Sequence, residues 1–123
     1  EKGQPDAARA TLAWLTEQGS DQLKAVARLR LASLQAEAKQ FDEALKTLSA
    51  PVPEAFQPLV ADRRGDIYMA QGKADEARAQ YETAWRAFSD RAEYRQLVGV
   101  KLAALGVDSA TLAPAPAAAE ATK

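Results

Sequence analysis

The sequence of 123 residues contains no cysteine and no histidine. Without cysteine the chain forms no disulfide bond and performs no thiolate chemistry, an absence that fits any cellular compartment. Without histidine it lacks the side chain that most often acts as a general base or binds a metal. We therefore expect no catalytic residues, no metal ligands and no cofactor.

An excess of charge of one sign is also missing. The 16 Lys and Arg residues are balanced by 17 Asp and Glu residues, and the formal net charge is -1. Proteins that bind nucleic acid normally show a clear basic excess over part of their surface. We therefore predict no nucleic-acid partner.

Long hydrophobic runs are absent as well. No stretch approaches the ~20 apolar residues that a membrane-spanning helix requires, and no signal peptide is visible. The chain opens on Glu1, inside a repeated pattern and without an initiator Met. We interpret the sequence as the N-terminally truncated part of a longer protein, so the missing anchor says little about its parent.

The residues that are present favour α-helix. Hydrophobic residues make up 47% of the chain, and Ala and Leu provide much of this fraction. Together with Glu, Gln, Lys and Arg they are strong helix formers, whereas Val and Ile are few. The sequence predicts an all-α fold of about six helices, at residues 5–18, 21–37, 41–49, 59–71, 74–88 and 91–105.

The predicted helix ends follow from capping and breaking residues. Ser20 or Asp21 is expected to cap the second helix, and Ser89 or Asp90 the sixth. The prolines of "APVPEAFQP" separate the third helix from the fourth. On the second helix, Leu23, Val26, Ala27, Leu31 and Leu34 form the expected buried stripe.

The last residues differ from the rest in composition. From residue 108 the sequence is rich in Ala and Pro, with no aromatic residue and no periodicity. We predict a repeat domain over residues 1–107 and a disordered tail over residues 108–123, polyproline-like around Pro114 and Pro116. A docking peptide is the alternative for the tail.

Two series of small residues repeat along the chain. Ala8, Ala44 and Ala77 are separated by 36 and 33 residues. A second series, Ala32, Gly65 and Gly99, alternates with the first and has separations of 33 and 34 residues. Two interleaved series of one period indicate a helix pair repeated along a solenoid. An unrelated six-helix bundle remains the alternative, since it obeys the same packing rules.

The spacing resembles that of the tetratricopeptide repeat. That pattern has a small residue and then an aromatic on the first helix, and an alanine and then an aromatic on the second. Small residues allow two helices to cross closely, and the aromatics fill the space beside the crossing. The pattern's first-helix Trp and Leu are absent, because Ala61 and Arg64 stand there. The repeat signature comprises Ala8, Ala32, Ala44, Gly65, Tyr68, Gly72, Ala77, Tyr81 and Gly99.

The phase of the repeat predicts the architecture. The first helix is the second half of a unit, the next four helices form two pairs, and the sixth covers the last pair. A terminal helix usually presents a polar outer face, and we expect Arg91, Glu93, Arg95 and Lys101 to provide it. Trp14, Tyr68, Tyr81 and Trp85 are expected in the core. Phe56 either plugs the groove between units or is exposed.

The densest charge cluster is "ADRRGD", residues 61–66. Asp62 and Asp66 lie four residues apart on one helical face, a spacing that suits acid–base work or a cation. No further catalytic or ligand residue converges on them, and "RGD" within a helix is read as coincidence. The cluster is either a solvated, salt-bridged face or part of a binding surface. First helices line the concave wall of such solenoids, which here predicts protein contacts by Leu29 and by Arg30, Ser33, Glu37, Asp62, Arg63, Asp66, Met69, Gln96, Leu97 and Val100.

Two longer stretches resemble one family more closely. These are "LKAVARLRLASLQAEAKQFDEALKTL", from Leu23, and "VADRRGDIYMAQGKADEARAQYETAW", from Val60. They are similar to the C-terminal part of YfgM-type proteins, the tetratricopeptide-like ancillary subunits of the bacterial SecYEG translocon. The resemblance covers roughly residues 4–105, including "EYRQLVGVKLAAL". Arg63 departs from it, since the family more often has an apolar residue there, and the loop before Leu59 is richer in proline.

This resemblance implies a location and partners that the residues alone do not. Family members carry an N-terminal transmembrane helix, place the repeat domain in the periplasm, and are thought to pass emerging proteins from SecYEG to periplasmic chaperones. They have no established catalytic residues. An adaptor in another envelope complex, such as outer-membrane protein assembly, is the alternative, and an enzyme is nearly excluded. A homodimer of the fragment could form through the unpaired first helix.

Overall fold

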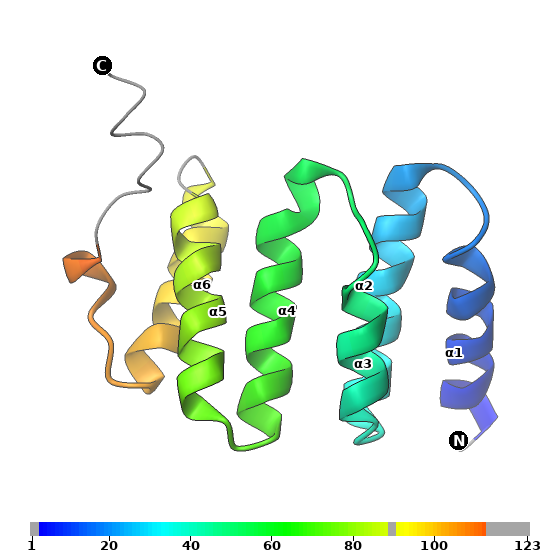
Figure 1. Ribbon diagram of the computed structural model, residues 1–123, viewed down its shortest axis with the longest axis horizontal. Helices are drawn as coiled ribbons and strands as arrows, with labels where there is room; N and C mark the ends of the chain where they lie inside the picture. The colour runs from blue at the N-terminus through cyan, green and yellow to red at the C-terminus, as the bar shows by residue number, and fades with distance from the viewer. Residues whose placement is uncertain (1–2, 89–90, 113–123) are drawn as a thin grey trace.

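A computed structural model of the chain describes residues 3–88 and 91–112, which form helices and turns. Six α-helices follow one another along the long axis of the molecule, with α1 and α6 towards opposite ends (Figure 1). Two 3-10 turns, η1 and η2, precede α4 and follow α6. The elements are α1 Gly3–Leu15, α2 Asp21–Glu37, α3 Phe41–Leu48, η1 Glu54–Phe56, α4 Gln57–Ala70, α5 Ala74–Ala87, α6 Ala92–Ala104 and η2 Ser109–Thr111.

The helices pack as the repeat predicts. The most extensive contacts join α4 to α5 and α2 to α3, while α1 packs on α2 and α6 packs on α5. Contacts between α2 and α4 connect the two pairs. The prediction of an all-α solenoid is confirmed.

The turns inside the two helix pairs have the same backbone geometry. Gly72 has φ 78°, and the N–H of Lys73 donates to the carbonyl of Tyr68 at 2.8 Å. In the preceding pair Lys39 takes the same place with φ 63°, and Gln40 donates to Gln35 at 2.8 Å. This bond satisfies a carbonyl left over at the helix end and reverses the chain within three residues. Lysine therefore adopts here a conformation that glycine adopts more readily.

The predicted caps are only partly observed. Ser20 caps α2, because its hydroxyl accepts a hydrogen bond from the N–H of Leu23 at 3.1 Å. Ser89 and Asp90 lie outside the described residues. α1 ends at Leu15, earlier than expected, because the residues before Gly19 form turns.

Small residues occupy the helix crossings. Ala32, Ala44 and Ala77 have no exposed surface. Gly65 lies against the ring of Tyr81, which is 2% exposed. Two apolar clusters result, one centred on α2, α3 and α4 and the other on α4, α5 and α6. Phe56 packs against the first cluster, so it plugs the groove between units rather than standing free.

Several residues expected in the core are exposed. Trp14 is 62% exposed, and Leu23 and Val26 are also exposed. All three lie on α1 and α2, where nothing in the described part of the chain covers their outer side. The sequence pattern predicts burial for these apolar residues. Their burial would require a further helix against α1 and α2, and the described residues do not provide one.

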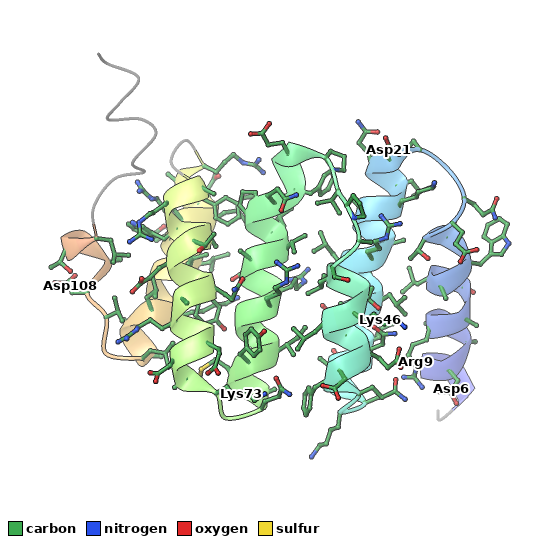
Figure 2. The ribbon with its side chains drawn as sticks, viewed as in Figure 1. Asp6, Arg9, Asp21, Lys46, Lys73 and Asp108 are labelled. Carbon is green, nitrogen blue, oxygen red and sulfur yellow. The ribbon has the colours of Figure 1, made fainter. Side chains whose placement is uncertain are left out.

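The chain after α6 covers the end of the solenoid. Asp108, labelled beside η2 in Figure 2, accepts a hydrogen bond from the N–H of Ala110 at 3.0 Å. Val107 and Leu112 pack against the second apolar cluster. The predicted tail therefore begins with a 3-10 turn, Ser109–Thr111, rather than with irregular chain. Residues 113–123, including Pro114 and Pro116, lie outside the described residues, and their disorder stays a prediction.

Candidate functional site

Two hollows lie along the first helices of the repeat units, α2, α4 and α6. One has a volume of about 360 Å³ and is mainly apolar. The other has a volume of about 340 Å³, lies between α2 and α4, and is mainly apolar as well. Arg63 of α4 lines both, so the two hollows adjoin there. We call them together the concave groove; its lining comprises Leu29, Ser33, Ala36, Glu37, Leu59, Asp62, Arg63, Asp66, Ile67, Ala70, Phe88, Tyr94, Leu97, Val98 and Lys101.

The groove contains much of the predicted binding wall. Of the residues predicted from the repeat phase, Leu29, Ser33, Glu37, Asp62, Arg63, Asp66 and Leu97 line it. Arg30 lies elsewhere, in the hollow between α1 and α2. Met69 and Val100 are exposed on α4 and α6 without lining either hollow, and Gln96 is exposed on α6.

The structure places Lys101 and Arg95 differently from the sequence prediction. Both were expected on a polar outer face of α6. Lys101 instead lies in the groove, and Arg95 lies over the ring of Trp85 at 4.2 Å and donates to the Trp85 carbonyl. Tyr94, Leu97 and Lys101 follow at spacings of three and four residues, which places them on one helical face. This spacing is the signal that could have placed Lys101 correctly.

Lys101 forms an ion cluster with the two carboxylates of α4. Its Nζ lies 2.9 Å from Asp62 Oδ1 and 3.1 Å from Asp66 Oδ1. The Tyr81 hydroxyl donates to Asp66 Oδ1 at 2.6 Å. The cluster therefore joins α4, α5 and α6. Both carboxylates therefore have partners within the protein. Among the described residues, no group of three or more Asp or Glu side chains that could hold a metal ion occurs.

The two sides of the ion pair respond differently to their surroundings. Burial raises the pKa of Asp62, against the lowering effect of Lys101. The pKa of Lys101 is also raised, because its bonds to Asp62 and Asp66 outweigh the opposing effect of burial. The difference follows from exposure and partner number: the Asp62 side chain is 14% exposed and the Lys101 side chain 34%, and Lys101 faces two carboxylates. The protein therefore stabilises the charged form of Lys101, whereas burial destabilises the charged form of Asp62.

We expect the stability of the fold to decrease in alkaline solution, and to decrease less steeply in Tyr81→Phe. Burial and the bond to Asp66 raise the pKa of Tyr81 above its ordinary 10.0, and that of Lys101 is raised above 10.5. Above these ordinary values the unfolded chain has lost protons that the folded chain keeps. Stability is therefore fully present below about pH 10 and falls as the pH rises.

The measurement is urea unfolding between about pH 8 and pH 11.5. Tyr94→Phe is the matched control, because Tyr94 is 40% exposed on α6 and does not belong to the ion cluster. Equal slopes of unfolding free energy against pH for the parent and Tyr81→Phe would contradict the assignment to Tyr81.

Arg63 is a charged residue of the groove with an unsatisfied hydrogen-bond donor. Its Nε is buried and has no hydrogen-bond partner among the described residues. Other half-buried arginines have carbonyl acceptors: Arg28 on Thr16 and Pro51, and Arg64 on Leu48. Lys101 holds Asp62 and Asp66, and neither carboxylate forms a salt bridge with Arg63. By contrast, Arg9 pairs with Asp6 on α1, far from the groove (Figure 2).

A further hollow, with a volume of about 540 Å³, lies between α1 and α2. The residues that line this hollow correspond, one repeat unit earlier in the sequence, to residues of the first apolar cluster. In that cluster the corresponding residues are covered by α2. Ala8, Leu12, Ala27 and Leu34 correspond to Ala44, Leu48, Val60 and Ile67. In that cluster Leu29 and Ala32 of α2 fill the equivalent place. The hollow therefore has the chemistry of a helix-stacking surface, and we do not assign it to a small ligand.

Comparisons with known proteins also indicate a tetratricopeptide-like repeat. A family model described as "Tetratricopeptide repeat-like domain" matches residues 1–107. A Neisseria gonorrhoeae protein named "Ancillary SecYEG translocon subunit" is 35% identical over 101 residues, covering 81% of this chain and 48% of the relative. An Escherichia coli protein of the same name is 41% identical over 68 residues, covering 55% and 33%. No solved structure matches significantly. The chain spans about half the length, or less, of these relatives.

Proposed function

We propose that this chain, which belongs to the tetratricopeptide repeat-like domain family, is a protein-interaction module associated with the SecYEG translocon. Its resemblance to YfgM-type ancillary subunits is confirmed by the two curated relatives. Since the chain covers only part of those proteins, their association with the translocon is extended to this chain as a proposal. The proposed role is non-catalytic.

The observation that carries the proposal is the distribution of exposed apolar side chains. Met69, Tyr94, Leu97 and Val100 are exposed on α4 and α6, next to the concave groove, and Leu97 and Val100 are 61% and 65% exposed. Their neighbours are the charged residues of the ion cluster and Arg63. Large apolar side chains surrounded by polar groups mark surfaces that bind other proteins.

The proposed location and further partners follow from the resemblance. We place the chain in the periplasm as part of an inner-membrane protein, between SecYEG and periplasmic chaperones. No helix among the described residues is both long and apolar enough to cross a membrane. An adaptor in another envelope complex remains the second candidate. A homodimer through the hollow between α1 and α2 also stays a prediction.

We expect photo-crosslinkers at Met69 or Val100 to capture SecYEG subunits in membranes, because these side chains flank the groove. Arg78 is the matched control, since it is exposed on α5, a second helix of the repeat. The products are identified by mass spectrometry. Capture from Arg78 alone would contradict binding through the groove, and capture of outer-membrane assembly proteins without SecYEG would favour the second candidate.

A further inference from the structure

We propose that Arg28, Arg64 and Arg95 are positioning residues that fix the angle at which each repeat unit stacks on the one before it. Each lies on the first helix of a unit and donates a hydrogen bond to a backbone carbonyl at the end of the preceding second helix. The curvature of a solenoid follows from the small rotation between successive repeats. The proposed role therefore concerns the shape of the whole stack, and it is independent of which partner the concave groove binds.

The first and last of these contacts are the same interaction in two different units. Arg28 of α2 donates to the carbonyl of Thr16, directly after the end of α1, at 3.2 Å. Arg95 of α6 donates to the carbonyl of Trp85, in the last turn of α5, at 3.0 Å. The two arginines are 67 residues apart and the two acceptors 69. These are the separations that the two series of small residues also show over two units, so both partners recur with the repeat.

The middle junction uses an equivalent contact one helical turn away. The residue of α4 that corresponds to Arg28 is Ala61, whose side chain has no donor. Arg64, three residues further along α4, instead donates to the carbonyl of Leu48 at 3.0 Å. Leu48 ends α3, and its place in the repeat is four residues before that of Trp85. Because α3 and α4 run in opposite directions (Figure 1), a donor one turn later meets an acceptor one turn earlier.

The position of these bonds explains how they could fix an angle. Carbonyls at the end of a helix lack a partner within the helix and carry part of the negative end of its dipole. A guanidinium satisfies such a carbonyl and places a positive charge beside it. Here the guanidinium belongs to the next unit, so the bond joins two units. Because N–H···O bonds weaken steeply away from a straight geometry, the bond resists rotation of one unit against the other.

Two of the three arginines have a second contact that orients the side chain. The Nη1 of Arg28 donates to the carbonyl of Pro51, in the loop between α3 and η1, at 3.1 Å. The guanidinium carbon of Arg95 lies 4.2 Å from the centroid of the Trp85 ring. A guanidinium presents its donors in a rigid fork and stacks on rings, whereas the ammonium group of lysine rotates freely on a flexible chain. We therefore expect lysine to replace these arginines only in part.

The test measures the distance between two spin labels by pulsed electron paramagnetic resonance. The chain has no cysteine, so Ala10→Cys on α1 and Ala79→Cys on α5 provide two exposed attachment sites. The junctions held by Arg28 and Arg64 lie between them. Arg64→Met removes the donors and should shift or broaden the distance distribution. A rotation of about 15°, within the normal scatter of helix crossings, moves a label about 20 Å from the junction by about 5 Å.

Further variants separate positioning from a general loss of stability. Arg28→Met should also change the distribution, because its junction lies between the labels, and Arg64→Lys should restore part of the parent distribution. Arg95→Met should leave the distance unchanged, because its junction lies outside the labelled pair. Leu102→Ala should lower stability without changing the distance. Circular dichroism establishes that each variant is folded.

Two results would overturn the inference. The first is a distance distribution like that of the parent in folded Arg28→Met and Arg64→Met, even where both are less stable, because the arginines would then only stabilise the fold. The second is a change of equal size in Arg95→Met or Leu102→Ala, because the distance would then report a loosening of the whole fold.

Discussion

Gly65→Ala is expected to lower the free energy of unfolding by about 2 kcal/mol. A Cβ atom at Gly65 would lie 2.4 Å from Tyr81 Cε1 and 2.6 Å from Cδ1. The ring cannot easily move away, since it is 2% exposed and its hydroxyl is bonded to Asp66. The methyl group must therefore push α4 away from α5, and this pair has the most extensive helix contact in the described chain.

The direction of this effect is informative, because intrinsic helix propensity predicts the opposite. Alanine in a helix interior is more favourable than glycine by roughly 1 kcal/mol. Urea unfolding followed by circular dichroism measures the difference, and the midpoint temperature should fall by roughly 5–15 °C.

Gly99→Ala is the matched control on α6. Its Cβ would lie 3.2 Å from Trp85 Cζ3 and 3.3 Å from Ser109 Oγ, contacts that small shifts can relieve. Its stability should stay within about 1 kcal/mol of the parent. If Gly65→Ala proves as stable as Gly99→Ala, a residue without a side chain at position 65 is not required for the close approach of α4 and α5.

Leu102→Ala is expected to lower the free energy of unfolding by about 3 kcal/mol. Leu102 has no exposed surface and lies in the second apolar cluster with Val98 and Phe88. Removing its side chain leaves a cavity between α5 and α6 in addition to the lost transfer free energy.

Leu97→Ala on the same helix is the comparison. Leu97 is 61% exposed, so its removal should change stability by no more than about 0.5 kcal/mol. Both variants are measured by urea unfolding. Equal destabilisation by the two substitutions would show that α6 is not anchored through Leu102.

The periodic features of the fold could be predicted from the sequence because they depend on local chemistry. Small residues at intervals near 34 mark the helix crossings, and Ala32, Ala44, Gly65 and Ala77 are found there. The turn at Gly72 and the cap at Ser20 also follow from the conformational and hydrogen-bonding preferences of single residues. These features do not depend on which distant segment packs nearby.

The candidate site could be predicted only in part, because its chemistry depends on partners far apart in sequence. Repeat phase placed Asp62, Arg63 and Asp66 on the groove wall, but it could not show that Lys101 takes both carboxylates. That pairing spans 39 and 35 residues, and it leaves Arg63 without an ion-pair partner among the described residues.

Burial likewise depends on what each helix packs against. Leu23 and Val26 have the apolar pattern of core residues, yet they are exposed because no described helix covers α1 and α2 on that side. Arg95 was expected to face solvent, yet it lies over Trp85 because α6 crosses α5 there. The helices, their pairing and their period follow from the order of the residues, since spacing and backbone preference act within one segment. Which charges are paired and which apolar faces are covered follows only from the packing of the helices, since both depend on the distances between segments.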